Sequence, residues 1–129
     1  MNREIKFRAW DKEIKQFSCI FEDYRIKDIN DYTDYEVMQY IGFKDKNGKE
    51  IYEGDIIQDE TGNVFIVRFG EFIIIEYDER QYGYYAEEVA KTEFEIGLTG
   101  NFPLFRLGCA QSVVIGNIYE NPELLEVQQ

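Results

Sequence analysis

Short runs of β-branched and aromatic residues recur along this 129-residue chain, and polar stretches rich in turn-forming residues separate them. In a strand, side chains at alternate positions share a face, and residues 5–10 alternate in this way. One face would carry Ile5, Phe7 and Ala9, and the other Lys6, Arg8 and Trp10. A polar turn at residues 11–15 and a second alternating run to Phe21 follow. The sequence therefore predicts an N-terminal hairpin over about residues 1–21.

The middle of the chain carries the strongest turn signal, Asn47–Gly48. Such a pair favours the positive φ angles of a type I′ turn, which would join a strand at Val37–Ile41 to an extended segment at Glu50–Ile57. Gly54 interrupts that segment, and a glycine inside a strand commonly marks a bulge or a close approach of backbone. We expect a hairpin here, with a bend at Gly54.

Two further strands are expected at Val64–Phe69 and Phe72–Tyr77, because both runs are rich in β-branched and aromatic residues. Gly70–Glu71 would form a tight connection between them. After this point the pattern weakens, although the good helix formers of Ala86–Lys91 could make about two helical turns. Val113–Ile115 predicts a last strand.

Short strands at intervals of about ten residues, with glycines at the bends, are typical of a small curled sheet. We therefore predict a mainly β fold. It would be a small SH3-like barrel of short antiparallel strands over about residues 37–119, with the N-terminal hairpin appended and one short helix at most. A chain of this length fits a single domain, residues 1–129, because domains cluster at roughly 100 to 150 residues.

The charge of the chain limits its partners. It has 26 acidic and 14 basic residues, a formal net charge of −12, and the resulting field repels polyphosphate, which disfavours non-specific binding of nucleic acid. No stretch reaches the roughly 20 apolar residues that cross a bilayer. The N-terminal residues lack the apolar core of a signal peptide. We expect a cytoplasmic protein with no membrane association.

Residue types that usually carry catalysis or hold metals are scarce. The chain has no histidine, the side chain most used for proton transfer near neutral pH and the commonest zinc ligand. Cys19 and Cys109 lie far apart in mostly apolar neighbourhoods, and we expect them to be unbridged core residues. No phosphate-binding loop or dinucleotide fingerprint occurs. We therefore expect no enzyme activity, no cofactor and no metal site.

Tyrosines and arginines gather at residues 68–85 and offer the best candidates for a binding surface. Aromatic rings beside guanidinium groups can stack on bases, and both residue types dominate protein-interface hot spots. The alternative is ordinary cross-strand packing of tyrosines. Trp10 is a further candidate, and its alternative is packing under the C-terminal segment. The candidate surface comprises Trp10, Arg68, Tyr77, Arg80, Tyr82, Tyr84 and Tyr85.

Three segments carry long and specific motifs: Arg3–Asp11, Gln39–Ile57 with the run QYIGFKDKNGKEIYEGD, and Val114–Leu125 with the run GNIYENPELL. Together they resemble the YopX-like family of phage and prophage proteins. The resemblance implies a small protein of a bacterial host's cytosol with an SH3-like barrel portion. It also implies no established activity and no catalytic residues, and it makes multimers plausible.

These observations lead to three hypotheses about function. The first is a non-catalytic module that binds a macromolecule, a host or phage protein, through an aromatic and acidic surface. The second is a barrel that binds nucleic acid through a local surface of Arg8, Arg68, Arg80 and Arg106. The third is an acidic mimic of nucleic acid that occupies the basic groove of a host enzyme. Exposed strand edges and abundant aromatics also favour a homo-oligomer.

Overall fold

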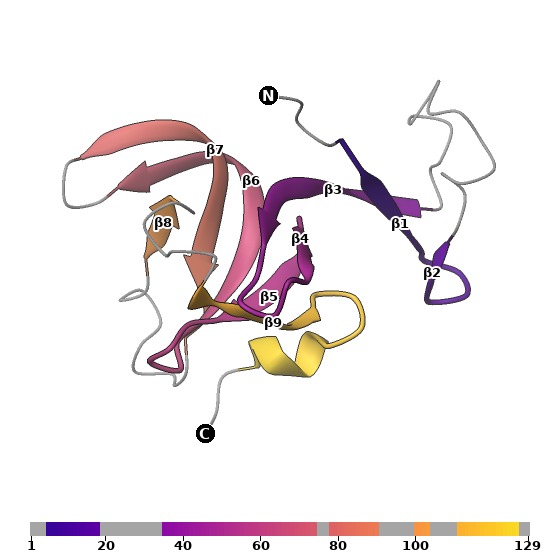
Figure 1. Cartoon of the computed structure of the whole chain (residues 1–129). Coiled ribbons are helices and arrows are strands. Elements are labelled where there is room, and N and C mark those ends of the chain that lie inside the picture. The colour runs from indigo at the N-terminus through magenta and orange to yellow at the C-terminus, as the bar shows by residue number, and fades with distance from the viewer. Residues whose placement is uncertain (1–4, 19–34, 75–77, 91–99, 104–110, 127–129) are drawn as a thin grey trace.

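The structure is a computed structural model that describes residues 5–18, 35–74, 78–90, 100–103 and 111–126. Within these ranges the chain is mainly β, and its antiparallel strands form one sheet of four strands and one of five. Figure 1 shows long, strongly curved strands wrapping around the centre of the molecule. The expected mainly β, barrel-like fold is confirmed. No helix in the described ranges is long and apolar enough to cross a membrane.

The first sheet contains the predicted N-terminal hairpin. β1 (Phe7–Asp11) pairs with β2 (Gln16–Ser18) on one side and with β3 (Tyr35–Lys44) on the other. β3 then pairs with β4 (Glu50–Tyr52), with an irregularity in its register. Figure 1 shows β1 and β2 projecting to one side, so the long β3 links the hairpin to the rest of the fold.

The second sheet contains the other five strands. These are β5 (Asp55–Gln58), β6 (Val64–Ile74), β7 (Glu79–Glu88), β8 (Asn101–Pro103) and β9 (Val113–Asn117). β6 and β7 form the longest ladder, while β5 lies between β6 and β9. The predicted bend at Gly54 separates β4 from β5, and the predicted last strand is β9.

Residues 64–74 form one continuous strand, so the expected connection at Gly70–Glu71 is wrong. Gly70 lies directly opposite Gly83 in the ladder, and the two φ angles are 149° and 152°. Glycine adopts this region of φ readily and other residues do not. The two facing glycines therefore let both strands bend without leaving the ladder.

The short helix expected from residue 86 onward is also wrong for the described residues. β7 runs through Glu88, and Ala86 pairs with Val67 of β6 and with Phe102 of β8. Helix propensities differ by only a few tenths of a kcal/mol per residue among such residues, so pairing on both sides of the strand outweighs them. The helical segment that the described residues do contain is a 3-10 turn at Pro122–Leu125.

Two hairpin turns, Asp45–Lys49 and Asp59–Asn63, share one geometry. In each turn, the backbone N–H of the first residue, an aspartate, donates to the backbone carbonyl of the last residue. The N–H of the glycine donates to the backbone carbonyl of the aspartate. Gly48 and Gly62 have φ angles of 82° and 90°, whereas the residues before them do not have positive φ. These are type I turns followed by a glycine bulge. The predicted turn at Asn47–Gly48 is therefore present, but its expected type I′ geometry is wrong.

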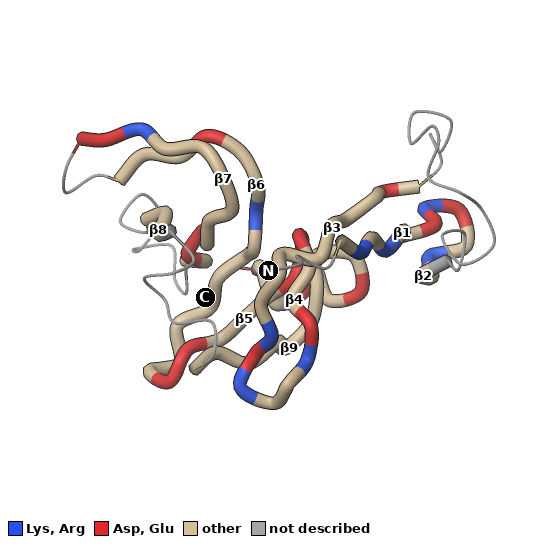
Figure 2. The backbone as a smooth tube through the Cα atoms, turned by 45° about the horizontal axis from the view of Figure 1, so that its top comes forward, with Lys and Arg blue, Asp and Glu red and all other residues tan. Residues whose placement is uncertain are grey.

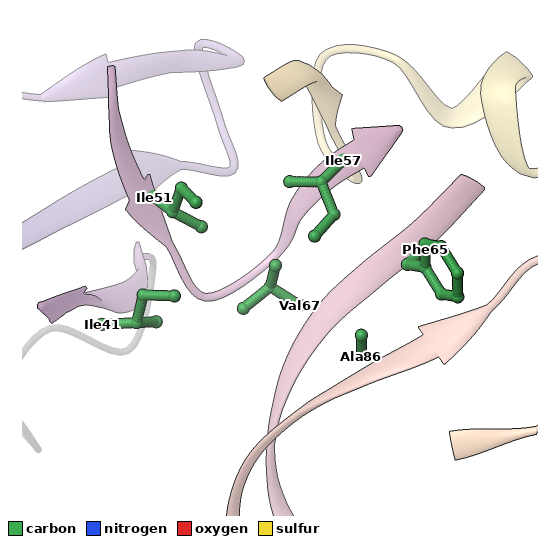
Figure 3. Close-up of a cluster of buried hydrophobic side chains, with 6 residues drawn as sticks. All are labelled: Ile41, Ile51, Ile57, Phe65, Val67 and Ala86. Atoms are coloured by element: carbon green, nitrogen blue, oxygen red, sulfur yellow. The ribbon is translucent and has the colours of Figure 1, made fainter. Parts of the chain in front are cut away.

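The core joins the two sheets. Its side chains point toward one another in Figure 3, and each is at most 3% exposed. Ile41 and Ile51 come from the first sheet, and Ile57 comes from the second. The remaining members are Phe65, Val67 and Ala86. Full burial of one isoleucine or phenylalanine side chain contributes about 1.5–3 kcal/mol, so this cluster holds both sheets in one body.

Candidate interaction surfaces

Arg8 connects the N-terminal hairpin to the barrel. Its Nη2 donates to Oδ1 of Asp55 at 2.5 Å, and Oδ2 of Asp55 accepts the N–H of Tyr52 at 2.8 Å. The guanidinium carbon lies 4.8 Å from the ring centroid of Phe17 and 4.7 Å from that of Tyr52. Both distances are within the range of cation–π attraction. Arg8 is thus held by a carboxylate and two aromatic rings at the same time.

The Asp55 side chain is 1% exposed. Burial raises the pKa of this carboxyl above its ordinary value, while the Arg8 charge and the Tyr52 N–H act in the opposite direction. Removal from water is therefore the largest influence on Asp55, as is common for a buried ion pair. Because Arg8 is committed to this pair, its charge does not stand free on a surface.

Trp10 lies beneath the C-terminal segment. Its ring stacks on Tyr119 at a centroid distance of 5.6 Å and an angle of 23°, and it meets Phe17 edge-on at 5.0 Å. The residue is 6% exposed. These contacts favour the second interpretation of Trp10, packing under the C-terminal segment. Little of the ring is available to a partner.

Tyr82 and Tyr84 lie on a two-stranded arm formed by residues 69–74 of β6 and 79–84 of β7. Figure 1 shows the two strands extending together away from β5 and β9. Residues directly opposite one another in a ladder share a face of the sheet. One face of this arm, which we call the arm face, carries the pairs Phe69–Tyr84, Glu71–Tyr82 and Ile73–Arg80.

Apolar side chains of the arm face are strongly exposed. Phe69 is 49% exposed, Ile73 43% and Tyr82 75%. The Phe69 ring makes edge contacts with Tyr82 at 5.3 Å and with Tyr84 at 4.8 Å. The arm face is therefore a row of aromatic rings in mutual contact, with its outermost ring mostly in water.

The opposite face of the arm differs. Phe72 and Ile74 are buried there, and Tyr85 stacks on Phe72 at 4.8 Å. Arg68 is the cross-strand partner of Tyr85 and so belongs to this side of the ladder. The structure thus brings Arg80, Tyr82 and Tyr84 together and separates them from Arg68 and Tyr85. Tyr77, Arg106, Cys19 and Cys109 lie outside the described residues.

The described arginines of the second hypothesis are engaged by carboxylates. Arg68 is paired with Glu87, and Arg80 donates to Glu71 at 3.3 Å. Figure 2 shows acidic and basic residues interspersed along the described backbone. Arg8, Arg68 and Arg80 therefore each have a carboxylate neighbour in the part of the chain that the structure describes.

A cleft of about 230 Å³ opens where the start of β3, the turn before β5, β6 and the C-terminal segment meet. Its charged and aromatic lining residues are Glu36, Glu53, Arg68, Phe69 and Tyr119. The cleft adjoins the arm face, because Phe69 belongs to both. Its volume is below the roughly 300–1,000 Å³ of most small-molecule sites.

Charged groups converge on this cleft. Burial raises the pKa of Glu53, although the Gln39 N–H, which donates to Glu53 Oε1 at 3.0 Å, acts to lower it. Burial also raises the pKa of Tyr119; Glu36 and Glu53 raise it further, while Arg68 opposes them. Both carboxylates therefore act on the Tyr119 phenol.

Sequence reasoning missed the cleft and the Arg8–Asp55 pair, because residues distant in the chain build both. Gly54 was the one available signal. Its φ of 83° and the 3.2 Å that would separate an added Cβ from Met38 Sδ require glycine there. The turn at Gly54 places Asp55 against Arg8, while Glu53 lines the cleft.

Comparison with known proteins gives a family and a fold. Residues 13–126 match a family model described as YopX protein. The chain is similar to a solved structure described as the crystal structure of protein EF1440 from Enterococcus faecalis, with a TM-score of 0.58 and 24% identity. That similarity covers 97% of this chain and 100% of the other, and at this identity it shows the fold alone. No curated protein matches the sequence.

Proposed function

Since this chain belongs to the YopX protein family, we propose that it is a non-catalytic accessory protein of a phage or prophage. It works in the bacterial cytosol by binding a protein partner through the arm face. The binding residues are Phe69, Ile73 and Tyr82, with the Glu71–Arg80 pair as the polar part of the surface.

The exposure of Tyr82 is the observation that carries this proposal. Cross-strand packing explains Tyr84 and Tyr85, but it leaves the Tyr82 ring 75% exposed. The edge contact with Phe69 restricts the ring before any partner arrives, which lowers the entropy lost on binding. Exposed tyrosine and arginine on a rigid strand pair are the residue types that most often dominate a protein interface.

Charge favours a protein over nucleic acid as the partner. The chain has a net charge of −12, and the described arginines named in the nucleic-acid hypothesis already have carboxylate partners. Binding to phosphate would have to break those pairs against an unfavourable overall field. An aromatic surface with one balanced charge pair avoids this cost.

The test compares the proteins that each variant captures from bacterial lysate, with and without nuclease treatment, by quantitative mass spectrometry. The test variant is Tyr82→Ser combined with Ile73→Ser, two exposed residues of the arm face that do not line the cleft. The matched control is Ile14→Ser, which removes an exposed apolar side chain, 60% exposed, from the β1–β2 turn. We expect a protein captured by the wild type and by the control to be lost from the arm variant, while all three have the same far-UV circular dichroism.

Two results contradict the proposal. One is a partner retained by the arm variant, which would place binding elsewhere. The other is captured material that disappears on nuclease treatment, which would favour nucleic acid. Because two copies of this chain could also pair through the arm face, light scattering on the purified protein reports whether the partner is a second copy.

A further inference from the structure

The cleft beside the arm face contains a carboxylate in an unusual position. Among the described carboxyl groups, Asp55 and Glu53 are the two at which burial outweighs the opposing contacts and leaves the pKa above its ordinary value. Asp55 has the Arg8 guanidinium and a backbone N–H as partners. Glu53 accepts the Gln39 N–H through Oε1, and no described lysine or arginine forms a salt bridge with it. It therefore bears part of the cost of burial without a counter-charge.

The other charges that line the cleft are already engaged. Arg68 is paired with Glu87, so its positive charge is directed to that carboxylate. Glu36 lies 3.5 Å from Lys12, and both side chains are about half exposed, 47% each. This exposed ion pair contributes little to stability, and its side chains rearrange easily. The lining residues carry two carboxylates and one guanidinium, so the balance of charge around the cleft is negative.

The remaining walls suit a flat cation. Phe69 and Tyr119 are aromatic, and Val37, Val67 and Ile118 are aliphatic. A guanidinium group is planar, stacks on aromatic rings and binds a carboxylate through two parallel N–H groups. At about 230 Å³, the cleft suits one long side chain better than a drug-sized molecule.

We propose that the cleft receives an arginine side chain of the protein partner, with the Glu53 carboxylate as its counter-charge. This inference rests on the proposed function, because Phe69 belongs both to the cleft and to the arm face. A partner seated on the arm face would place an arginine at the edge of its own interface into the cleft. The pair would give specificity through a fixed geometry and a matched charge.

The experiment uses the full chain and a small probe, so it does not depend on knowing the partner. N-acetyl-arginine N-methylamide is titrated into the ¹⁵N-labelled protein, and amide shifts are followed by NMR. The citrulline counterpart, which has the same shape without the charge, is the control ligand. Glu53→Gln keeps an acceptor for the Gln39 N–H, so we expect it to fold, and Glu60→Gln at an exposed turn position is the control variant.

We expect saturable shifts at the amides that line the cleft. Binding should be at least about tenfold weaker for Glu53→Gln, because the variant loses the charge that strengthens the hydrogen bond to the guanidinium. Glu60→Gln should bind like the wild type. The inference is overturned if the wild type shows no saturable binding, if citrulline binds as well as arginine, or if Glu53→Gln binds as well as the wild type. The arm variant with serine at positions 73 and 82 leaves the residues that line the cleft unchanged. Loss of partner capture in that variant therefore tests the arm face, and the arginine titration tests the cleft.

Discussion

Arg8 and Asp55 are 47 positions apart in the sequence, and their Nη2 and Oδ1 atoms are 2.5 Å apart in the structure. This contact, together with the rings of Phe17 and Tyr52, fastens the N-terminal hairpin to the barrel. Removal of Arg8 leaves the Asp55 carboxylate, which is 1% exposed, without its counter-charge.

We expect Arg8→Met to lower the free energy of unfolding by about 3 kcal/mol, the low end of the roughly 3–5 kcal/mol seen for broken buried pairs, because the Arg8 side chain is 20% exposed. Arg80→Met breaks an exposed pair and should cost less than about 1 kcal/mol. Urea denaturation followed by circular dichroism measures both. Equal losses in the two variants would show that the Arg8–Asp55 pair does not hold the hairpin.

Asp45 should be more important for stability than the similar Asp59. Asp45 is 6% exposed and accepts the N–H groups of Asn47 and Lys49 in its own turn and of Val114 in β9. We expect Asp45→Ala to cost about 1–3 kcal/mol for each buried donor that water cannot reach. Asp59 bonds only within its own turn among the contacts seen, so thermal unfolding of Asp59→Ala should show a clearly smaller loss.

Glu53 should make stability fall as the pH rises. Burial raises its pKa in the folded protein above the ordinary value of 4.5. In the range just above 4.5 the folded protein therefore keeps a proton that the unfolded chain has released, and this stabilisation is lost as the pH rises through the folded-state pKa. Glu53→Gln has no such group. Its free energy of unfolding, relative to the wild type, should therefore increase between about pH 4 and about pH 7.

Asp59→Asn is the control, because Asp59 should change stability with pH in the opposite direction. Burial alone would raise the pKa of Asp59, but hydrogen bonds from Thr61 and Asn63 lower it below the ordinary value of 3.8. The stabilisation from Asp59 is therefore present above about pH 3.8 and is lost as the pH falls through the folded-state pKa. Urea midpoints at a series of pH values test both variants. A flat difference for Glu53→Gln would show that its carboxyl is not desolvated.

Replacing either of the facing glycines of the arm, Gly70 or Gly83, should destabilise the protein because of the backbone conformation there. An added Cβ at Gly70 or Gly83 would meet nothing within 4 Å, so there is no steric clash to relieve. Their φ angles of 149° and 152° are nevertheless unfavourable for other residues, and we expect Gly70→Ala to cost on the order of 1–3 kcal/mol. Gly100→Ala, where φ is not positive, should be close to neutral. Unfolding midpoints that move equally would contradict this account.

Patterns in the sequence correctly predicted the elements that are specified by interactions between neighbouring residues. The hairpin at β1 and β2, the turn at Asn47–Gly48 and the last strand β9 all follow from residues close in sequence. The type of the Asn47–Gly48 turn was wrong although its signal is local, and the two other errors arose where distant partners decide the structure. Gly70 looks like a connection until Gly83 is known to lie opposite it, and Ala86 looks helical until β6 and β8 flank it. The charges at Glu53 and Asp55 could not be assigned, because their surroundings come from segments far along the chain.

The stacking of Trp10 on Tyr119 also constrains how the protein is made. The strand that carries Trp10 is synthesised well before Tyr119, the residue whose ring covers it. During synthesis the tryptophan must therefore remain exposed or in provisional contacts while the segment between the two residues is translated. Contacts between such distant positions slow folding. The N-terminal hairpin should consequently gain its stacking contact only after Tyr119 has left the ribosome.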